Sequence, residues 1–260
     1  MRASIRIRRK KIEEYINEFQ AVSIQELSDM LGVSLPTIRR DLIALEDEKI
    51  IERFHGGVRK KRTANYIHGS LEENEYIFRL EKKKEEKKRI AQKAIEFIRD
   101  NDIVFMNSGT TVLNIFSSLD CKNITVVTNN VAAIKFEALE NIDLILLGGV
   151  YNKRLQSLLG ELTTNSIKSI FSNCTILGVN GLDIERGMTT SVYQECSIND
   201  AMIQQCNGKV ILLADSSKIG FVANFVSAPL SKIDILITDD GCPPQYLQRL
   251  RDKGIEVYVV

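Results

Sequence analysis

Two patterns of apolar residues divide this chain. Up to residue 57 the apolar positions recur every three or four residues, which is the spacing of one helix face, and they predict three short helices followed by a hairpin. From residue 90 onward short apolar runs alternate with amphipathic stretches. The segment between them is polar, and its charges of mixed sign at helical spacing predict a linker and a connecting helix. We therefore expect one domain at 1–57, a connector at 58–89 and a second domain at 90–260.

The second domain is predicted to be of the α/β class with a mostly parallel sheet. Continuous apolar strands that alternate with helices are typical of a sheet covered on both faces. The expected strands lie at residues 103–106, 124–128, 144–147, 175–179, 210–214, 235–238 and 255–259. In such sheets ligands bind at the carboxyl ends of the strands, and here those ends are rich in Gly, Thr, Ser, Asn and Asp.

The first domain carries the signals of a helix-turn-helix. Ser23 and Glu26 form a predicted capping box before the second helix, and Gly32 supplies the turn after it. Ser34 is expected to cap the third helix, and Pro36 suits its first turn because a missing N–H costs little there. Two short helices around a glycine turn make a helix-turn-helix.

The third helix is predicted to read double-stranded DNA. Ile38, Leu42 and Leu45 share one face and should pack on the first two helices. Arg40 points the other way, and such an arginine can bond guanine in the major groove. A Gly-Gly hairpin that follows predicts a wing. The residues expected to contact DNA are Ser34, Pro36, Thr37, Arg39, Arg40, Arg53 and His55. Solvated surface charge is the ordinary alternative for the arginines.

The distribution of charge along the chain indicates which domain binds a polyanion. Residues 1–62 carry 14 Lys/Arg and 10 Asp/Glu, a net charge of +4, whereas residues 90–260 carry 14 and 18, a net charge of −4. Only the first domain is therefore expected to meet a polyanion. Further contacts to phosphates, which supply sequence-independent affinity, are expected from Arg6, Arg8, Arg9, Lys10 and Lys11.

Cysteine and apolar content predict a cytoplasmic protein without a metal or other cofactor. The five cysteines form no C-x-x-C pair and the chain has two histidines, which argues against a zinc site or a disulfide framework. No run approaches the ~20 apolar residues of a membrane span. The basic start lacks the apolar region of a signal peptide, so no membrane contact is expected.

The residues at the carboxyl ends of the first three expected strands of the second domain predict an anion-binding pocket. Gly109 lets the backbone approach a ligand, hydroxyl groups flank it, and a helix begins directly after it. The next two strands end on the same edge if the sheet is parallel. Lys218 is the preferred charged contact because a flexible ammonium suits a phosphate. The expected binding residues are Ser108, Gly109, Thr110, Thr111, Thr128, Asn129, Gly148, Gly149, Asp183, Glu195 and Lys218. Each one alone also fits a helix-cap turn or a surface ion pair.

These stretches together resemble the DeoR family of bacterial transcription regulators. Residues 37–42, with Leu45 and Glu46 after them, are similar to the family's recognition helix, and residues 55–58 to its wing. Weaker motifs follow in the family's order at residues 108–111, 128–130, 147–149, 178–183, 187–190, 215–218 and 237–240.

The resemblance implies a repressor of a sugar or nucleoside catabolic operon. Its C-terminal domain would be a sensor related to sugar-phosphate isomerases, and a phosphorylated sugar bound there would change the affinity for operator DNA. It would act as a homodimer or homotetramer. One position departs from the family, which often has Lys four residues after the Glu that matches Glu195. Here that position is Asn199, followed by Asp200, which points to a different or less anionic ligand.

Two other functions stay open. Asp183, Glu195 and Lys218 are side-chain types that a sugar-phosphate isomerase uses for proton transfer, so an isomerase-like enzyme is one alternative. We expect no catalytic residue, because an isomerase would not need a DNA-reading domain. An activator without a small-molecule input is the other alternative, since repression and activation differ in where the operator lies.

Overall fold

The computed structural model describes residues 2–19, 21–48, 50–54, 57–60, 71–119, 123–136 and 141–260. The chain divides into two compact units, Met1–Phe78 and Arg79–Val260. Our expected domain limits fall inside elements, because strand β3 continues past residue 57 and helix α5 passes through residue 89. No helix within the described ranges is both long enough and apolar enough to span a membrane.

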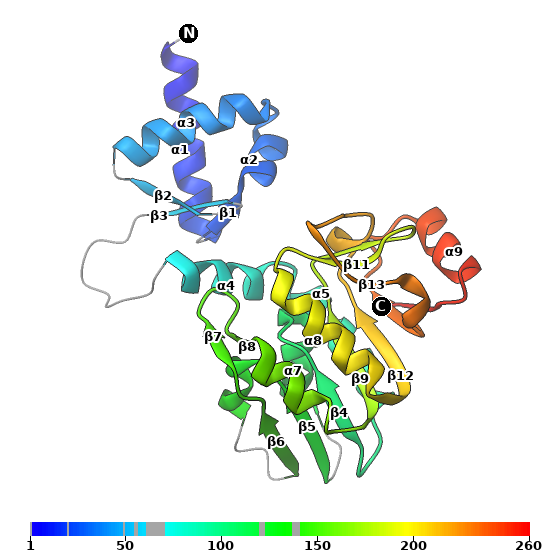
Figure 1. Cartoon of the computed structure of the whole chain (residues 1–260). Coiled ribbons are helices and arrows are strands. Elements are labelled where there is room, and N and C mark those ends of the chain that lie inside the picture. The colour runs from blue at the N-terminus through cyan, green and yellow to red at the C-terminus, as the bar shows by residue number, and fades with distance from the viewer. Residues whose placement is uncertain are drawn as a thin grey trace. The chain divides into compact units, whose positions relative to one another are not determined.

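The first unit combines three helices with a small antiparallel sheet (Figure 1). Its helices are α1 (Arg2–Phe19), α2 (Ile24–Leu31) and α3 (Leu35–Asp47). Its strands, in the sheet order β1–β3–β2, are β1 (Ala21–Ser23), β3 (Gly57–Lys60) and β2 (Ile51–Phe54). The predicted helix-turn-helix with a hairpin is thus confirmed. Strand β1, which pairs with β3, was not predicted.

Local sequence explains where these helices begin and end. Ser23 Oγ accepts a hydrogen bond from the N–H of Glu26 at 3.1 Å, and Glu26 Oε2 accepts one from the N–H of Ser23 at 2.7 Å, as the capping box predicted. Gly32 ends α2 with a φ of 62°, a conformation open to glycine at little cost. Ser34 is the N-cap residue of α3, as expected, but its hydroxyl bonds to Thr37 Oγ1 at 3.0 Å and makes no capping bond to a backbone N–H.

The core of the first unit forms on the predicted face of α3. Ile38, Leu42 and Leu45 are buried. They pack in one cluster with residues from α1, α2 and the small sheet, namely Ile12, Ile16, Val22, Leu27, Ile51 and Val58. Burial of such side chains contributes about 1.5–3 kcal/mol each, so this cluster fixes the orientation of α3.

The second unit is built on a seven-stranded parallel sheet in the order β15–β14–β12–β9–β4–β5–β6, which confirms the predicted architecture. Its strands are β4 (Ile103–Met106), β5 (Ile124–Thr128), β6 (Ile142–Leu146), β9 (Ser172–Gly178), β12 (Cys206–Leu213), β14 (Ile235–Thr238) and β15 (Glu256–Val259).

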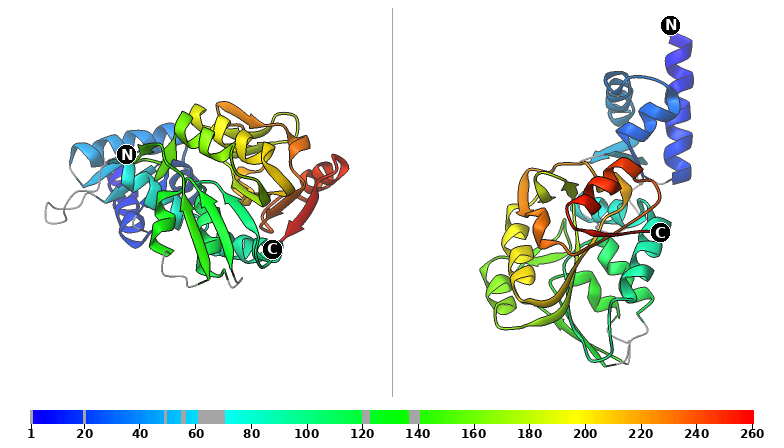
Figure 2. Two further views of the ribbon diagram at one scale, coloured as in Figure 1. Left: turned by 60° about the horizontal axis from the view of Figure 1, so that its bottom comes forward. Right: turned by 90° about the vertical axis from the view of Figure 1, so that its right-hand side faces the viewer.

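Helices cover both faces of this sheet, as the edge-on view in Figure 2 shows. On one face lie α7 (Glu161–Ile167) and α8 (Tyr193–Gln204), and on the other lies α5 (Lys84–Ile95). Helix α4 (Leu71–Glu81) precedes α5, and the division between the two units falls within it. The remaining helices are α6 (Thr110–Leu113), η1 (Asn114–Ser117), η2 (Val131–Phe136), η3 (Ser216–Lys218), η4 (Leu230–Lys232) and α9 (Pro244–Asp252).

Two small antiparallel sheets, which were not predicted, complete the second unit. One is the hairpin of β7 (Val150–Asn152) and β8 (Ser157–Leu159). The other, in the order β10–β11–β13, comprises β10 (Gly181–Asp183), β11 (Gly187–Thr190) and β13 (Phe225–Ala228). Both follow the carboxyl ends of parallel strands, so they shape the edge at which a ligand is expected.

Candidate functional site

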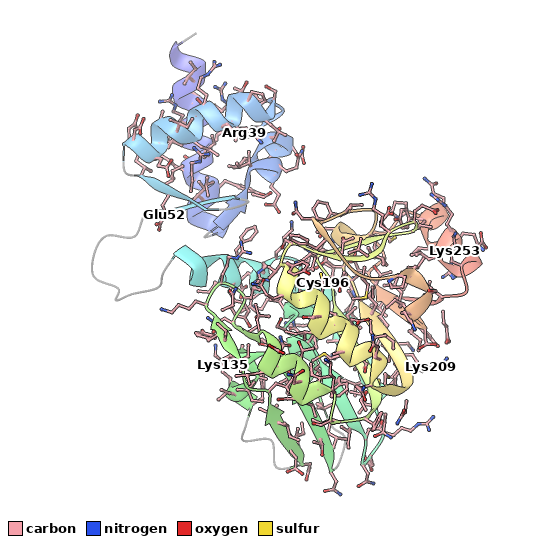
Figure 3. The ribbon with its side chains drawn as sticks, viewed as in Figure 1. Arg39, Glu52, Lys135, Cys196, Lys209 and Lys253 are labelled. Atoms are coloured by element: carbon pink, nitrogen blue, oxygen red, sulfur yellow. The ribbon has the colours of Figure 1, made fainter. Side chains whose placement is uncertain are left out.

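Helix α3 presents two arginines to solvent. Arg39 and Arg40 are exposed, and none of the residues in the described ranges forms an ion pair or hydrogen bond with either guanidinium group. Figure 3 labels Arg39 on this helix. Ser34 and Pro36 are also exposed, and Thr37 is half-buried. The face that we expect to contact DNA is therefore accessible.

Two arginines of α1 pair with a buried carboxylate of α3. Asp41 of α3 is only 2% exposed. It accepts a hydrogen bond from Arg8 Nε at 2.5 Å and another from Arg9 Nε at 3.3 Å, and Arg9 also lies 3.6 Å from Glu48. Because a buried carboxylate needs such partners, Arg8 and Arg9 join α1 to α3. Their side chains stay 20% and 26% exposed, so contacts of Arg8 and Arg9 with phosphates stay a prediction.

The wing is tied to the end of α3 through Glu46. The backbone N–H of Arg53 donates to Glu46 Oε1 at 3.2 Å, and the Arg53 guanidinium lies 3.7 Å from Glu46 Oε2. His55 lies outside the residues that the structure describes. The expected DNA contacts of the third helix and the wing stay predictions.

The second unit has a pocket where its strand order reverses. Strands β5 and β6 follow β4 on one side, whereas β12, β14 and β15 follow β9 on the other. Open α/β sheets bind ligands at such a reversal, outside the carboxyl ends of the strands. Two glycines let β4 and β9 come close there, since a Cβ on Gly178 would lie 3.1 Å from Gly109 Cα. The sheet topology itself thus places the pocket at the carboxyl ends of β4 and β9.

The pocket brings together part of the predicted site. The expected residues that line it are Ser108, Gly109, Thr110, Thr111, Glu195 and Lys218. They come from the loop after β4, the start of α6, the start of α8 and η3. The helix after Gly109 adds less than expected, because α6 has only four residues and a helix this short carries little macrodipole. An anion would therefore be held mainly by side chains.

The expected residues after β5 and β6 do not line this pocket. Asn129 Nδ2 donates to the carbonyl of Leu158 at 3.0 Å, and the hydroxyl of Thr163 donates to the carbonyl of Gly148 at 2.7 Å. The β7–β8 hairpin and α7 thus cover this part of the sheet edge. The expected residues that lie there are Thr128, Asn129, Gly148 and Gly149.

Asp183 is also absent from the lining of the pocket. Its Oδ1 accepts hydrogen bonds from the N–H groups of Glu185 at 3.1 Å and Arg186 at 2.9 Å, in the turn between β10 and β11. An Asp that bonds the backbone two or three residues ahead is a common turn stabiliser. Asp183 belongs to a stretch that resembles a DeoR-family motif, but in this structure it stabilises a turn and does not line the pocket.

Three cations that the sequence analysis did not select reach the pocket, namely Arg79, Lys82 and Lys87. Lys87 is 4% exposed, and its Nζ donates to the carbonyl of Arg79 and to Thr110 Oγ1, the latter at 3.1 Å. These residues lie in a charge-dense stretch that resembles a solvated helix face. The available signal was that Lys87 shares the helical spacing of Ile90 and Ala94, which are buried.

Burial and crowding make Lys87 and Lys218 costly to charge. Burial lowers the pKa of Lys87 to about 8; the charge of Asp215 opposes this, and Lys218, Arg79 and Lys82 add to it. Burial also lowers the pKa of Lys218, with the same opposition from Asp215. A bound anion would relieve this repulsion between like charges.

Glu195 and Asn199 bring an acidic and a neutral side chain to the same pocket. Glu195 accepts a hydrogen bond from the hydroxyl of Thr190, and burial raises the pKa of its carboxyl group. Asn199 Nδ2 donates to Ser227 Oγ at 2.8 Å, while its Oδ1 accepts from Asn107 Nδ2 at 3.1 Å. The amide at position 199 is therefore fixed by two buried partners and brings no charge to the pocket.

Asn107 joins the two strands at the base of the pocket. Its Oδ1 accepts hydrogen bonds from the N–H groups of Gly178 at 2.8 Å and Gly109 at 3.2 Å, and its Nδ2 donates to the carbonyl of Gly178 at 3.0 Å. One side chain thus holds the ends of β4 and β9 in place. Among the described residues, no three His, Cys, Asp or Glu side chains cluster as they would around a metal ion.

Comparison with known proteins assigns both units. The model of a DeoR-like helix-turn-helix domain matches residues 8–63, and that of the DeoR C terminal sensor domain matches residues 82–240. This chain belongs to the DeoR family of transcriptional regulators. The exposed arginines on α3 of this DeoR-family regulator lie within the part that matches the helix-turn-helix model, and the pocket residues from Lys82 to Lys218 lie within the part that matches the sensor model.

Relatives cover nearly the whole DeoR-family chain. The uncharacterized HTH-type transcriptional regulator YulB of Bacillus subtilis (strain 168) is 34% identical over 97% of this chain and 96% of its own. The HTH-type transcriptional regulator IolR of the same organism is 31% identical over 97% and 98%. The HTH-type transcriptional repressor GlcR, also from this organism, is 31% identical over 95% and 93%.

Solved structures resemble this regulator only weakly. Ribose 5 phosphate isomerase A from Neisseria gonorrhoeae aligns with a TM-score of 0.37 at 19% identity, covering 51% of this chain and 52% of its own. The full-length sorbitol operon regulator SorC from Klebsiella pneumoniae aligns with a TM-score of 0.35 at 14% identity, covering 83% and 90%. Likeness at this level carries no argument about function.

Proposed function

We propose that this regulator is a repressor that leaves its operator when a phosphorylated sugar binds at the carboxyl ends of β4 and β9. The observation that carries the proposal is the charge of the pocket. Four cations and two carboxylates line it, which leaves a formal surplus of two positive charges, and they are Arg79, Lys82, Lys87, Lys218, Asp215 and Glu195. A phosphate monoester carries about −1.5 to −2 at pH 7, so one such group balances the surplus.

The mixed lining of the pocket favours a sugar with a single phosphate. The cations suit the phosphate group, and Glu195 and Asn180 offer acceptors and donors to sugar hydroxyl groups. A second phosphate would approach the Glu195 carboxylate and find a neutral amide at Asn199. The proposal therefore excludes bisphosphorylated sugars as the preferred effector.

The DNA-binding part of the proposal places α3 in the major groove of an operator. Arg40 would read base edges, while Thr37 would contact a phosphate or a thymine methyl group. Helix-turn-helix regulators commonly bind paired half-sites as dimers, and we propose a homodimer or homotetramer here. Repression is favoured over activation because the relative GlcR is named a repressor.

The test is a titration of a labelled operator fragment with the full-length protein, with and without sugar monophosphates. We expect the effector to weaken operator binding by about 5- to 150-fold, the usual range of such coupling. Lys218→Met should keep operator affinity but require far more effector. Lys209→Met is the matched control, because Lys209 is exposed, lies outside the pocket and pairs with Asp234 at 3.6 Å.

Two results would overturn this proposal. If sugar monophosphates change neither the operator affinity nor the thermal stability of the protein, the pocket is not an effector site. If the protein instead interconverts an aldose phosphate and a ketose phosphate, and Lys218→Met abolishes that turnover, the isomerase-like alternative is favoured.

A further inference from the structure

Helix α4 ends at the pocket and contributes cations to it. Arg79 lies in its last turn, Lys82 follows directly after its end at Glu81, and both line the pocket. The helical path breaks at Lys83, whose φ of 52° is in the left-handed region, before α5 begins. Because the division between the two units falls between Phe78 and Arg79, α4 is also the helix through which the chain passes from one unit to the other.

The break after α4 is fixed to the sensor domain. Lys83 Nζ donates to Ser216 Oγ at 2.9 Å and to Asp239 Oδ2 at 3.3 Å. The last turn of α4 is also attached to the sensor domain. The carbonyl of Arg79 accepts from Thr110 Oγ1 at 3.4 Å and from Lys87 Nζ, and Arg79 Nη2 donates to the carbonyl of Arg154 at 2.8 Å. Thr110 and Lys87 line the pocket, so part of this attachment is made by pocket residues.

Like charges lie close together in the pocket. Arg79 and Lys82, on the α4 side, both disfavour the charged forms of Lys87 and Lys218, which belong to α5 and η3. Asp215 is the carboxylate that offsets this repulsion at both lysines. None of the residues that the structure describes pairs with Lys82, so its ammonium is available to a ligand.

We propose that Arg79 and Lys82 are effector-binding residues, and that a phosphate held between them and Lys87 and Lys218 tightens the attachment of the end of α4 to the sensor domain. This inference rests on the proposed function. A dianion between two pairs of cations turns their repulsion into attraction to a shared partner, and charge-assisted hydrogen bonds to phosphate are the strong ones. The effector thus acts directly on the helix that leads to the DNA-binding unit.

Inorganic phosphate is the probe for the first test, at constant ionic strength set with chloride. In the full-length protein, hydrogen exchange should slow at the amides of the last turn of α4 and the turn after it, residues 79–83, when phosphate binds. Lys82→Met should weaken phosphate binding by about tenfold, the effect of losing one charge-assisted contact. It should also lose the slowing of exchange at residues 79–83.

Lys88→Met is the matched control. It removes the same charge from the same stretch, but Lys88 is exposed, lies outside the pocket and pairs with Glu85 at 2.9 Å. This variant should bind phosphate like the unaltered protein and show the same slowing of exchange.

The outcomes separate this inference from the proposed function. Phosphate binding that is lost in Lys218→Met but unchanged in Lys82→Met and Arg79→Met, with exchange at residues 79–83 unaffected, would refute the role of α4 and leave the effector pocket intact. Absence of phosphate binding to the unaltered protein would refute both. Weakened binding in Lys82→Met together with lost protection supports the inference.

Discussion

Lys87 illustrates how one buried charge can report the state of the pocket. Its ammonium is nearly inaccessible to water and faces Arg79, Lys82 and Lys218, with Asp215 as the opposing charge. A phosphate group would supply the negative charge that the protein itself provides only in part. Lys87 is therefore placed to bind an anion, and without a bound anion its charge lowers the stability of the fold.

We expect this loss of stability to appear in the pH dependence of the free energy of unfolding. The pKa of Lys87 is about 8 in the folded protein and near 10.5 in the unfolded chain, so between these values the unfolded state binds more protons. The free energy of unfolding should therefore rise with pH in this window, by about 1 kcal/mol between pH 7 and pH 9. Urea unfolding of the ligand-free protein at pH 7, 8 and 9 measures it.

The variant Lys87→Met should lose this rise, while Lys88→Met, which alters an exposed lysine, should keep it. The difference between the variants matters more than the absolute slope, because burial also lowers the pKa of Lys218 and raises that of Cys174 to about 12. Equal slopes in the unaltered protein and in Lys87→Met would show that Lys87 stays fully charged.

Arg40 carries the corresponding prediction for the DNA-binding unit. It is exposed on the side of α3 opposite the buried Ile38 and Leu42. Arg40→Ala should weaken operator binding by about 1–3 kcal/mol and reduce discrimination against altered operators, as expected for a base contact. Fluorescence anisotropy with an operator and a base-substituted copy measures both quantities.

Lys11→Ala provides the contrast, because Lys11 is exposed on α1, outside α3, and we expect it to contact phosphates, so its loss should weaken binding to all sequences alike. If Arg40→Ala also weakens the operator and the substituted copy by the same factor, Arg40 contacts phosphate and the assignment of the reading face is wrong.

At the scale of elements, the approach of β4 and β9 controls the shape of the pocket. Gly178→Ala would place a Cβ 3.1 Å from Gly109 Cα and 3.4 Å from Val112 Cγ2. Because the obstacle is backbone, the loop after β4 must move, which should cost about 1–3 kcal/mol of stability and weaken binding of sugar monophosphates. The midpoint of urea unfolding and calorimetric titration check the two effects.

Gly148→Ala is the control for this change. A Cβ at Gly148 meets no atom within 4 Å, and it follows β6, away from the pocket. Stability should change by less than about 0.5 kcal/mol, as is usual for surface sites. A loss of stability as large as that of Gly178→Ala would mean that the close approach at the strand reversal is not the cause.

The sequence predicted those elements whose apolar pattern is long or strictly periodic. The seven parallel strands and the buried face of α3 follow from such patterns, and the capping box at Ser23 follows from local chemistry. The strands β1, β7, β8 and β10 have three residues each, too few to show an alternation. They form because neighbouring elements offer them a partner, which the sequence pattern does not record.

The same limit explains the errors in the predicted site. Residues after β5 and β6 share the sheet edge with Gly109, but the reversal of strand order puts the pocket at β4 and β9, and the short β7–β8 hairpin covers the rest. Asp41 and Lys87 are charged residues on buried faces, with spacing that fits Ile38 and Ile90. Sequence reasoning missed these two residues because charged side chains in a helix are usually exposed to solvent.

At the scale of the whole molecule, binding of the effector and its effect on DNA are separable quantities. The concentration of effector needed reflects its affinity, whereas the fall in operator affinity at saturation reflects the coupling between the two sites. If α4 carries the coupling, variants on its side of the pocket should reduce the fall at saturation. Variants on the far side should only shift the concentration needed.

Lys82→Met and Lys218→Met make this comparison, since both remove one ammonium from the same pocket. At saturating sugar monophosphate, operator affinity of the unaltered protein should fall by about 5- to 150-fold. In Lys218→Met the operator affinity should fall by the same factor at saturation, but at higher effector concentration, because Lys218 lies in η3, away from α4 in the sequence. In Lys82→Met the fall in operator affinity at saturation should be clearly smaller. Operator titrations at several effector concentrations give both numbers. Identical plateaus would mean that the signal leaves the sensor domain by another route than the end of α4.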